Sequence, residues 1–252
     1  MSISADQSQN PIIGWSGLAV ALLVVLTAGS LFYLNTRSAE LKATQMAPSS
    51  LSALYLRLSL ESHPRDASLR LKTARAYKSI GRLEEALVLL KPLINVNSHH
   101  RAAAQLLQVE IGFLQWTATA PEGAEHKAKL ERLQADITSI DFTRLSIKDC
   151  EALVALSRKT GLIELAGEIN AHLALRGGPN WETYLQEADR AFLEVGRAKD
   201  SAALYAEVIG PNVEARYQHH VFTALDRLNS SEGAAAAFAL AQTLLARFPN
   251  NR

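Results

Sequence analysis

The chain has a single cysteine, Cys150, among its 252 residues. One thiol cannot form an internal disulfide, and none of the CxxC spacings of metal sites is present. Cysteine usage is therefore compatible with a reducing or an oxidising compartment. An excess of one charge is also lacking, because 26 Lys and Arg residues nearly balance 25 Asp and Glu residues. This balance does not favour nucleic-acid binding, and we expect no nucleic-acid partner.

Sequence motifs of common catalytic sites are absent as well. HExxH, GxSxG, the P-loop and GxGxxG do not occur in the chain. Its histidine pairs are adjacent, at His99-His100 and His219-His220. Adjacent side chains diverge by about 100° on a helix, unlike the i, i+4 pair that binds a metal. No basic residue flanks Cys150, which favours a buried structural thiol over a nucleophile. We therefore predict a protein that is not an enzyme, with no catalytic residue, cofactor or metal site.

Charge is missing altogether from one long segment, residues 12–34 (IIGWSGLAVALLVVLTAGSLFYL). A helix of this length covers roughly 34 Å, enough to cross a hydrocarbon core of about 30 Å. Trp15 and Tyr33 lie near its two ends, where aromatic belts occur. A cleaved signal peptide is the alternative, but the first ten residues contain no Lys or Arg and the apolar run is long. We interpret residues 12–34 as an uncleaved transmembrane anchor.

Aromatic residues are few, at 6%, whereas Ala and Leu are abundant, which favours helices. In residues 67–98, small, large and turn-forming residues follow one another at Ala74, Tyr77, Gly81, Ala86 and Leu90. A second such stretch surrounds Gly196, where Tyr205 matches the position of Leu90. Ser230 follows Gly196 by one period of about 34 residues, and Ala235 falls at the next small position. These are the marker positions of a tetratricopeptide repeat (TPR), and the chain resembles TPR proteins there.

Together with the anchor at 12–34, this resemblance predicts an all-α fold, with an N-terminal transmembrane helix followed by a TPR-like helical-hairpin solenoid that has an irregular middle. TPR proteins are mostly binding modules, so it also implies a scaffold that mediates protein–protein interactions. The expected segments are a short polar N-terminus at 1–11, the transmembrane helix at 12–34, a juxtamembrane linker at 35–47, TPR-like helices at 48–115, an insertion loop and irregular helix at 116–145, and TPR-like helices at 146–252. The last segment is either a terminal group of repeats or the start of a longer array.

A partner would lie on the first helices of successive repeats, which line the concave face of a TPR array. Aligning the repeats by their turn residues places one set of side chains on this face: Leu71, Arg75, Lys78, Gln186, Arg190, Leu193, His220, Ala224 and Arg227. Four of them are Arg or Lys, which suits an acidic peptide, a carboxylate terminus or a charged polysaccharide. A solvated helix face without a partner is the alternative. The carboxylate-clamp pattern of chaperone-binding TPRs is not reproduced.

A narrower resemblance concerns the order of segments. A single anchor is followed by ALYLRLSLESHPRDASLRLKTARAYKSIGRLEEALVLLKPLI, an irregular stretch and renewed repeats. This order resembles the N-terminal part of the PelB-like family of Pel exopolysaccharide export proteins. The resemblance implies a bacterial inner-membrane protein with a periplasmic repeat domain, partners among envelope or polysaccharide-assembly proteins, and contact with polysaccharide. The outer-membrane β-barrel of that family is absent from this sequence, so no export-channel role is implied.

The sequence leaves open on which side of the membrane the repeats lie and which process they serve. Arg37 and Lys42 follow the anchor and favour a cytoplasmic C-terminus, but two charges orient a long translocated domain only weakly. The PelB-like resemblance favours the periplasm instead. Other single-pass TPR proteins act as adaptors in membrane-complex biogenesis or periplasmic quality control, and this remains the alternative to a role in exopolysaccharide synthesis or export.

Overall fold

The computed structural model describes residues 49–96, 98–121, 123–208 and 218–247. These residues form helices only, with no strand among them, as expected for an all-α protein. No helix in these ranges is long and apolar enough to cross a membrane. The predicted anchor at 12–34 and the linker at 35–47 lie outside the described residues. The chain divides into two compact units, residues 1–82 and 83–252, and each is described by itself.

The described part of the first unit is a helical hairpin of α2 (Ser50–Ser62) and α3 (Ala67–Ser79). Local sequence explains both starts, because the side chains of Ser49 and Asp66 accept hydrogen bonds from first-turn backbone amides that have no partner within the helix. The hairpin core is made by apolar residues spaced at helical intervals, such as Leu56 and Leu60, which are buried. The buried hydroxyl of Thr73 donates to the Leu69 carbonyl oxygen at 2.8 Å, so its burial leaves no unpaired donor.

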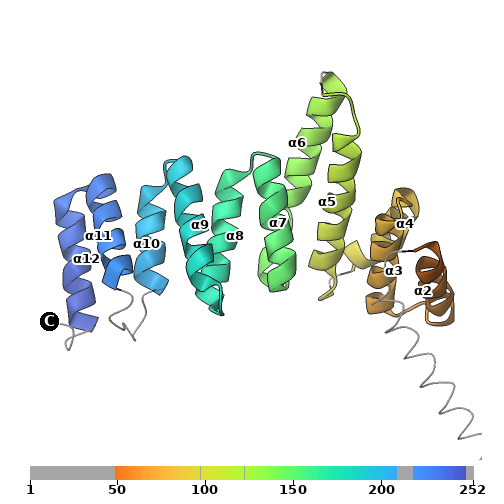
Figure 1. The fold of residues 1–252 in the computed structure, drawn as a ribbon, viewed down its shortest axis with the longest axis horizontal. Coiled ribbons are helices and arrows are strands. Elements are labelled where there is room, and N and C mark those ends of the chain that lie inside the picture. The colour runs from red at the N-terminus through yellow and green to blue at the C-terminus, as the bar shows by residue number, and fades with distance from the viewer. Residues whose placement is uncertain (1–48, 97, 122, 209–217, 248–252) are drawn as a thin grey trace, which may run out of the picture. The chain divides into compact units, whose positions relative to one another are not determined.

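The second unit is a succession of helices that contact mainly their neighbours along the chain. They are α4 (Leu83–Ile94), α5 (Arg101–Thr117), α6 (Ala124–Thr138), α7 (Ile147–Lys159), α8 (Ile163–Arg176), α9 (Trp181–Glu194), α10 (Ala198–Val208), α11 (Gln218–Glu232) and α12 (Ala234–Arg247), with a short 3₁₀ helix, η1 (Phe142–Arg144), before α7. Figure 1 shows α7 to α12 side by side in chain order. This arrangement buries residues between consecutive helices and leaves each helix with an outward face.

The turn between α9 and α10 depends on Gly196, which has φ +76°. Its N–H donates to the Leu193 carbonyl at 3.1 Å, and the Arg197 N–H donates to the Phe192 carbonyl at 2.7 Å. These two bonds are those of a Schellman motif, in which the residue after the helix takes a left-handed conformation that favours glycine. The turn residues Gly81 and Gly161 have the same pair of hydrogen bonds around them and similar φ values, +79° and +80°.

The last turn differs from the sequence prediction. Ser230 was expected to separate the final two helices, but α11 continues to Glu232 and the turn is made by Gly233, with φ +90°. Glycine adopts this conformation without the penalty that a serine would meet, so the turn lies three residues later than one TPR period predicts. As a consequence Ala235, expected at a buried helix crossing, is exposed.

The irregular middle is a second kind of hairpin, made by α5 and α6. The loop expected from Trp116 begins later, because α5 extends to Thr117. Figure 1 shows this hairpin projecting beyond the end of the neighbouring α7. At its base a continuous core joins α5, α6, α7 and α8. Cys150 is fully buried in that core, and burial raises the pKa of its thiol, as expected for a structural cysteine.

Candidate partner-binding surface

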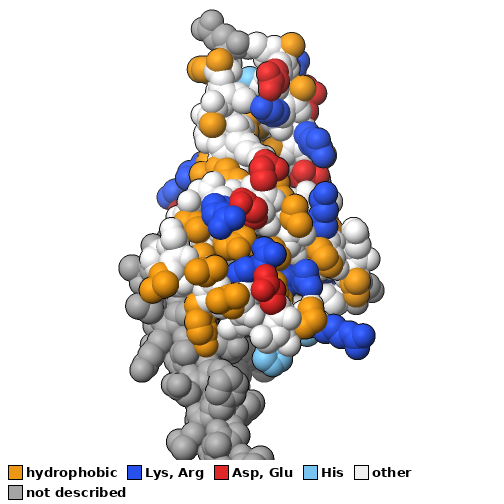
Figure 2. All heavy atoms as spheres, turned by 90° about the vertical axis from the view of Figure 1, so that its right-hand side faces the viewer, with side chains coloured by type: hydrophobic (Ala, Val, Ile, Leu, Met, Phe, Trp, Pro, Cys, Tyr) orange, Lys and Arg blue, Asp and Glu red, His pale blue; other side chains and the backbone are white. Residues whose placement is uncertain are grey.

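The first unit contributes three of the residues predicted to contact a partner, all on α3. Arg75 is exposed and Lys78 is half-buried, so both reach the surface. Leu71 is buried, with 6% of its surface exposed, and belongs to the hairpin core rather than to an accessible face. The apolar stripe of α3 is therefore wider than the alignment of turn residues suggested. On the side of the molecule that Figure 2 shows, basic, acidic and hydrophobic side chains are interspersed, and no block of one charge covers the view.

In the second unit the predicted residues divide into exposed and buried sets. Arg190 on α9 is 69% exposed, and Arg227 on α11 is 33% exposed. His220 and Ala224, placed on the same face by the sequence, are buried instead, and His220 is only 2% exposed. The reason is the position of the last turn. Because the turn lies at Gly233 rather than at Ser230, the alignment of α11 with the earlier repeats shifts by three residues. The positions equivalent to Gln186, Arg190 and Leu193 are then occupied by Thr223, Arg227 and Ser230.

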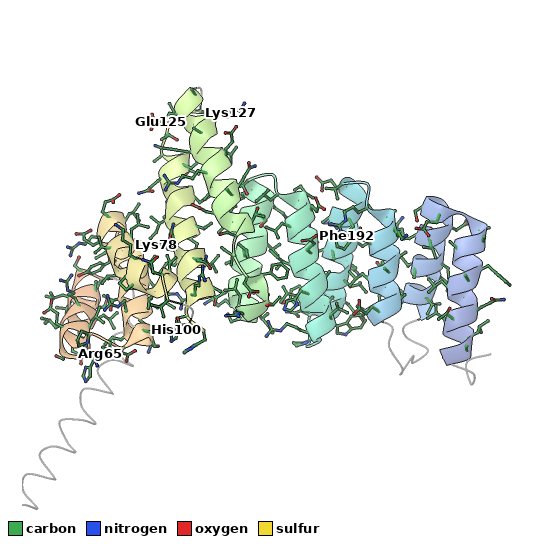
Figure 3. All side chains as sticks on the ribbon, turned by 180° about the vertical axis from the view of Figure 1, so that it is seen from behind. Arg65, Lys78, His100, Glu125, Lys127 and Phe192 are labelled. Carbon is green, nitrogen blue, oxygen red and sulfur yellow. The ribbon has the colours of Figure 1, made fainter. Side chains whose placement is uncertain are left out.

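The predicted repeat markers divide into exposed and buried positions, and the turn residues Gly81 and Gly196 are exposed. Five of the marker side chains are buried: Ala74, Tyr77, Ala86, Leu90 and Tyr205. Phe192, labelled in Figure 3, is buried on α9 beside the α9–α10 turn, and the Arg197 guanidinium lies 5.1 Å from the centre of its ring. Arg197 also pairs with Glu164 and Glu168 of α8 at 2.6 and 2.9 Å. This charge cluster joins α8 to the start of α10.

Polar contacts link the first helices α7 and α9. One nitrogen of Arg158 on α7 lies 2.8 Å from a carboxylate oxygen of Glu187 on α9. The other oxygen of Glu187 lies 3.0 Å from Arg190. One carboxylate is thus shared by two guanidinium groups, and the trio, which we call the Arg158–Glu187–Arg190 cluster, has one positive charge in excess. Such a cluster can bind a carboxylate without first losing its own internal pairing.

A more enclosed polar site centres on Asp189 of α9, whose side chain is 13% exposed. Its carboxylate accepts a hydrogen bond from the Ser201 hydroxyl and a longer one, 3.4 Å, from the Tyr205 hydroxyl, both on α10. Arg227 Nε of α11 lies 3.5 Å from the same carboxylate, as an ion pair without hydrogen-bond geometry. Burial, together with the negative charge of Asp189, raises the pKa of Tyr205 to about 12. Tyr205 therefore stays protonated and donates to Asp189 at neutral pH.

His220 packs beside this site, with its ring centre 5.8 Å from that of Tyr205 and 5.5 Å from that of Trp181. Burial lowers the pKa of His220, and the positive charge of the neighbouring His219 lowers it further. The neutral imidazole therefore acts as a packing group between α9, α10 and α11. Sequence reasoning missed Asp189. The sequence did contain a signal, because Asp189 is an acidic residue next to the apolar positions Leu185, Ala188 and Phe192, which form the buried stripe of α9.

Within the described ranges no three His, Cys, Asp or Glu side chains gather in a way that could hold a metal ion. The Asp189 carboxylate is engaged by Ser201, Tyr205 and Arg227, so it is not positioned as a free base. Comparison with family models, with curated proteins and with solved structures gives no match for this chain.

Proposed function

We propose that this protein is a membrane-anchored, TPR-like scaffold of the bacterial envelope that binds other proteins and has no catalytic activity. The observation that carries this proposal is the succession of helical hairpins in the second unit, whose helices contact mainly their chain neighbours. An array of this kind displays the outward faces of its first helices side by side, which is how repeat proteins bind partners. The anchor would be residues 12–34, with the repeats in the periplasm and exopolysaccharide synthesis or export as the process served.

The partner-binding face in this proposal is formed by α7, α9 and α11. The Arg158–Glu187–Arg190 cluster supplies a net positive charge there, and Arg227 lies on the neighbouring first helix. These charges favour an acidic surface of an envelope or polysaccharide-assembly protein, or an anionic polysaccharide. Because Arg227 is held by Asp189, Arg190 is the most exposed of the three arginines and the first contact we expect.

Site-specific photo-crosslinking in cells tests this proposal. A photoreactive amino acid replaces Arg190 on the first-helix face or, as a matched control, Ala203, which is exposed on the second helix α10. We expect discrete crosslinked partners from position 190 and none from position 203. Equal crosslinking from both positions, or none from either, would contradict a partner on this face. Turnover of a substrate by the purified protein would contradict the non-enzymatic assignment.

A further inference from the structure

A groove of about 570 Å³ lies beside the α5–α6 hairpin, and none of its lining residues belongs to α7, α9 or α11. Its walls come from α4, α5 and α6, because α5 packs against both α4 and α6 and leaves a channel between them. Leu87 of α4 and Leu133 of α6 give the groove apolar contact surface. Most of the groove's surface is apolar and a few polar side chains line it, which is the composition of a binding groove.

The α5 wall carries Gln108, Gly112 and Gln115, which follow one another at the i, i+4, i+7 spacing of one helix face. Gly112 has no side chain to fill the groove, and a Cβ at this position would lie 3.4 Å from the Leu133 side chain. Gln115 donates to Glu84 at 3.1 Å, which leaves its side-chain oxygen free to accept. Gln108 has no hydrogen-bond partner among the described residues. A glutamine amide offers one acceptor and donor groups, the complement of a peptide group.

The α6 wall carries two basic residues followed by one acidic residue, Lys129, Arg132 and Asp136. Lys129 is compensated by Glu125, 2.8 Å away near the outer end of the hairpin, where Glu125 and Lys127 are labelled in Figure 3. Arg132 and Asp136 also line the groove, and neither has an ion-pair partner among the described residues. They stand one helical turn apart, about 6 Å along the axis. The groove therefore presents one unpaired positive and one unpaired negative group in sequence.

We infer that this groove binds an extended peptide segment of a partner protein, with an acidic and a basic side chain two residues apart. Residues i and i+2 of an extended chain project to the same side, about 6.6 Å apart, which matches the separation of Arg132 and Asp136. The acidic side chain pairs with Arg132 and the basic one with Asp136, while Gln108 and Gln115 pair with the peptide backbone. The run from Gln108 to Gln115, about 10 Å, accommodates roughly three extended residues.

Fluorescence anisotropy on the full-length protein in detergent micelles tests this inference. The probes are fluorescein-labelled peptides of about ten residues with a Ser, Gly and Leu background, carrying Glu-x-Lys, Glu-x-Glu or Lys-x-Lys at the centre. We expect saturable binding that is about fivefold tighter for Glu-x-Lys than for the other two, the scale of an exposed ion pair. The Arg132→Glu variant should reverse this order and prefer Lys-x-Lys, because its groove then carries two carboxylates.

The control is Arg190→Glu, which alters the first-helix face of the proposed function and should leave the peptide preference unchanged. Circular dichroism should show equal helicity for both variants, since Arg132 and Arg190 are exposed. Absence of saturable binding, equal affinity for the three peptides, or an unchanged preference in Arg132→Glu would overturn the inference. A change of preference in Arg190→Glu alone would place peptide binding on the first-helix face and also overturn the groove assignment.

Discussion

Asp189 connects three helices through one carboxylate, since it accepts from Ser201 and Tyr205 of α10 and pairs with Arg227 of α11. The Ser201 and Tyr205 hydroxyls lose their hydrogen bonds to water when they are buried. The Asp189 carboxylate stabilises the fold mainly by accepting hydrogen bonds from these hydroxyls. Asp189 is itself on α9, and its contacts therefore set how α11 lies against the preceding pair. An acidic residue within an apolar stripe is, in this protein, a packing element rather than a surface charge.

Replacing this carboxylate should destabilise the second unit. We expect Asp189→Ala to lower the free energy of unfolding by about 1–3 kcal/mol, because Ser201 and Tyr205 would be left as buried donors without their acceptor. Urea titration followed by circular dichroism measures this loss. Asp226→Ala, on the exposed side of α11, is the control and should change the stability by less than about 0.5 kcal/mol. Equal effects of the two variants would show that the Asp189 contacts do not stabilise the helices.

His220 predicts a dependence of stability on pH. Burial and His219 lower its pKa in the folded state, whereas Glu182 acts weakly in the opposite direction. The unfolded chain takes up a proton near the ordinary pKa of about 6.5, and the folded chain resists it, so stability should fall as pH drops below about 6.5. The melting temperature of His220→Gln should depend less on pH between 8 and 5 than that of the wild type. An identical dependence in both proteins would exclude His220 as its source.

At the scale of elements, the hairpins are closed by turns that the local sequence specifies. Gly196 illustrates this, because its φ of +76° is needed for the two hydrogen bonds that end α9. A Cβ on Gly196 would meet no atom within 4 Å, so the cost of a side chain there is conformational rather than steric. Gly167 on α8 has the opposite constraint, since a Cβ would lie 3.1 Å from Ala191 and Phe192 of α9. One glycine serves the turn and the other the close approach of two helices.

Two substitutions at Gly196 separate these causes. We expect Gly196→Val to destabilise the protein by about 1–2 kcal/mol, because a β-branched residue is strained in the left-handed region. Gly196→Asn should cost less, since asparagine tolerates this conformation better. Thermal unfolding followed by circular dichroism compares them. If valine and asparagine lowered the melting temperature equally, the backbone conformation would not be the limiting factor at this turn.

At the scale of the whole molecule, the proposed role depends on residues 12–34 acting as an anchor and on the side of the membrane that the repeats occupy. Two positive residues after the anchor, Arg37 and Lys42, are a small orienting term, and a long domain translocates largely regardless of such charges. These charges favour a cytoplasmic C-terminus only weakly, and we expect a periplasmic repeat domain mainly because of the PelB-like resemblance.

Reporter fusions measure this topology directly. Alkaline phosphatase fused after Arg252 should be active in cells, because it folds only in the periplasm, and a fluorescent reporter that matures only in the cytoplasm should be dark at the same position. The membrane fraction should retain the fusion after carbonate extraction. A dead phosphatase fusion with a bright cytoplasmic reporter would reverse the topology and, with it, the proposed role in export.

The sequence alone was sufficient to predict most of the helices and several of their ends. Capping side chains such as Ser49 and Asp66, and turn glycines such as Gly81 and Gly196, act within a few residues of their own positions. The repeat stretch predicted around Gly196, for example, corresponds to α9 and α10, which lie on either side of this glycine. Local interactions of this kind can be recognised without knowing which helix packs against which. The TPR assignment, the anchor and the partner stay predictions.

What each helix face contacts was decided by the tertiary structure. The sequence placed Leu71 and His220 on an accessible face, whereas packing buries both. A fixed repeat period predicted the last turn at Ser230, and the three-residue displacement to Gly233 rotated α11 enough to exchange buried and exposed positions. The contacts of Asp189 and the groove between α4, α5 and α6 likewise join segments that are distant in the sequence. Helix ends follow from neighbouring residues, but burial and charge pairing depend on the rotation of each helix against the next, which is set by the shapes of all the side chains between them.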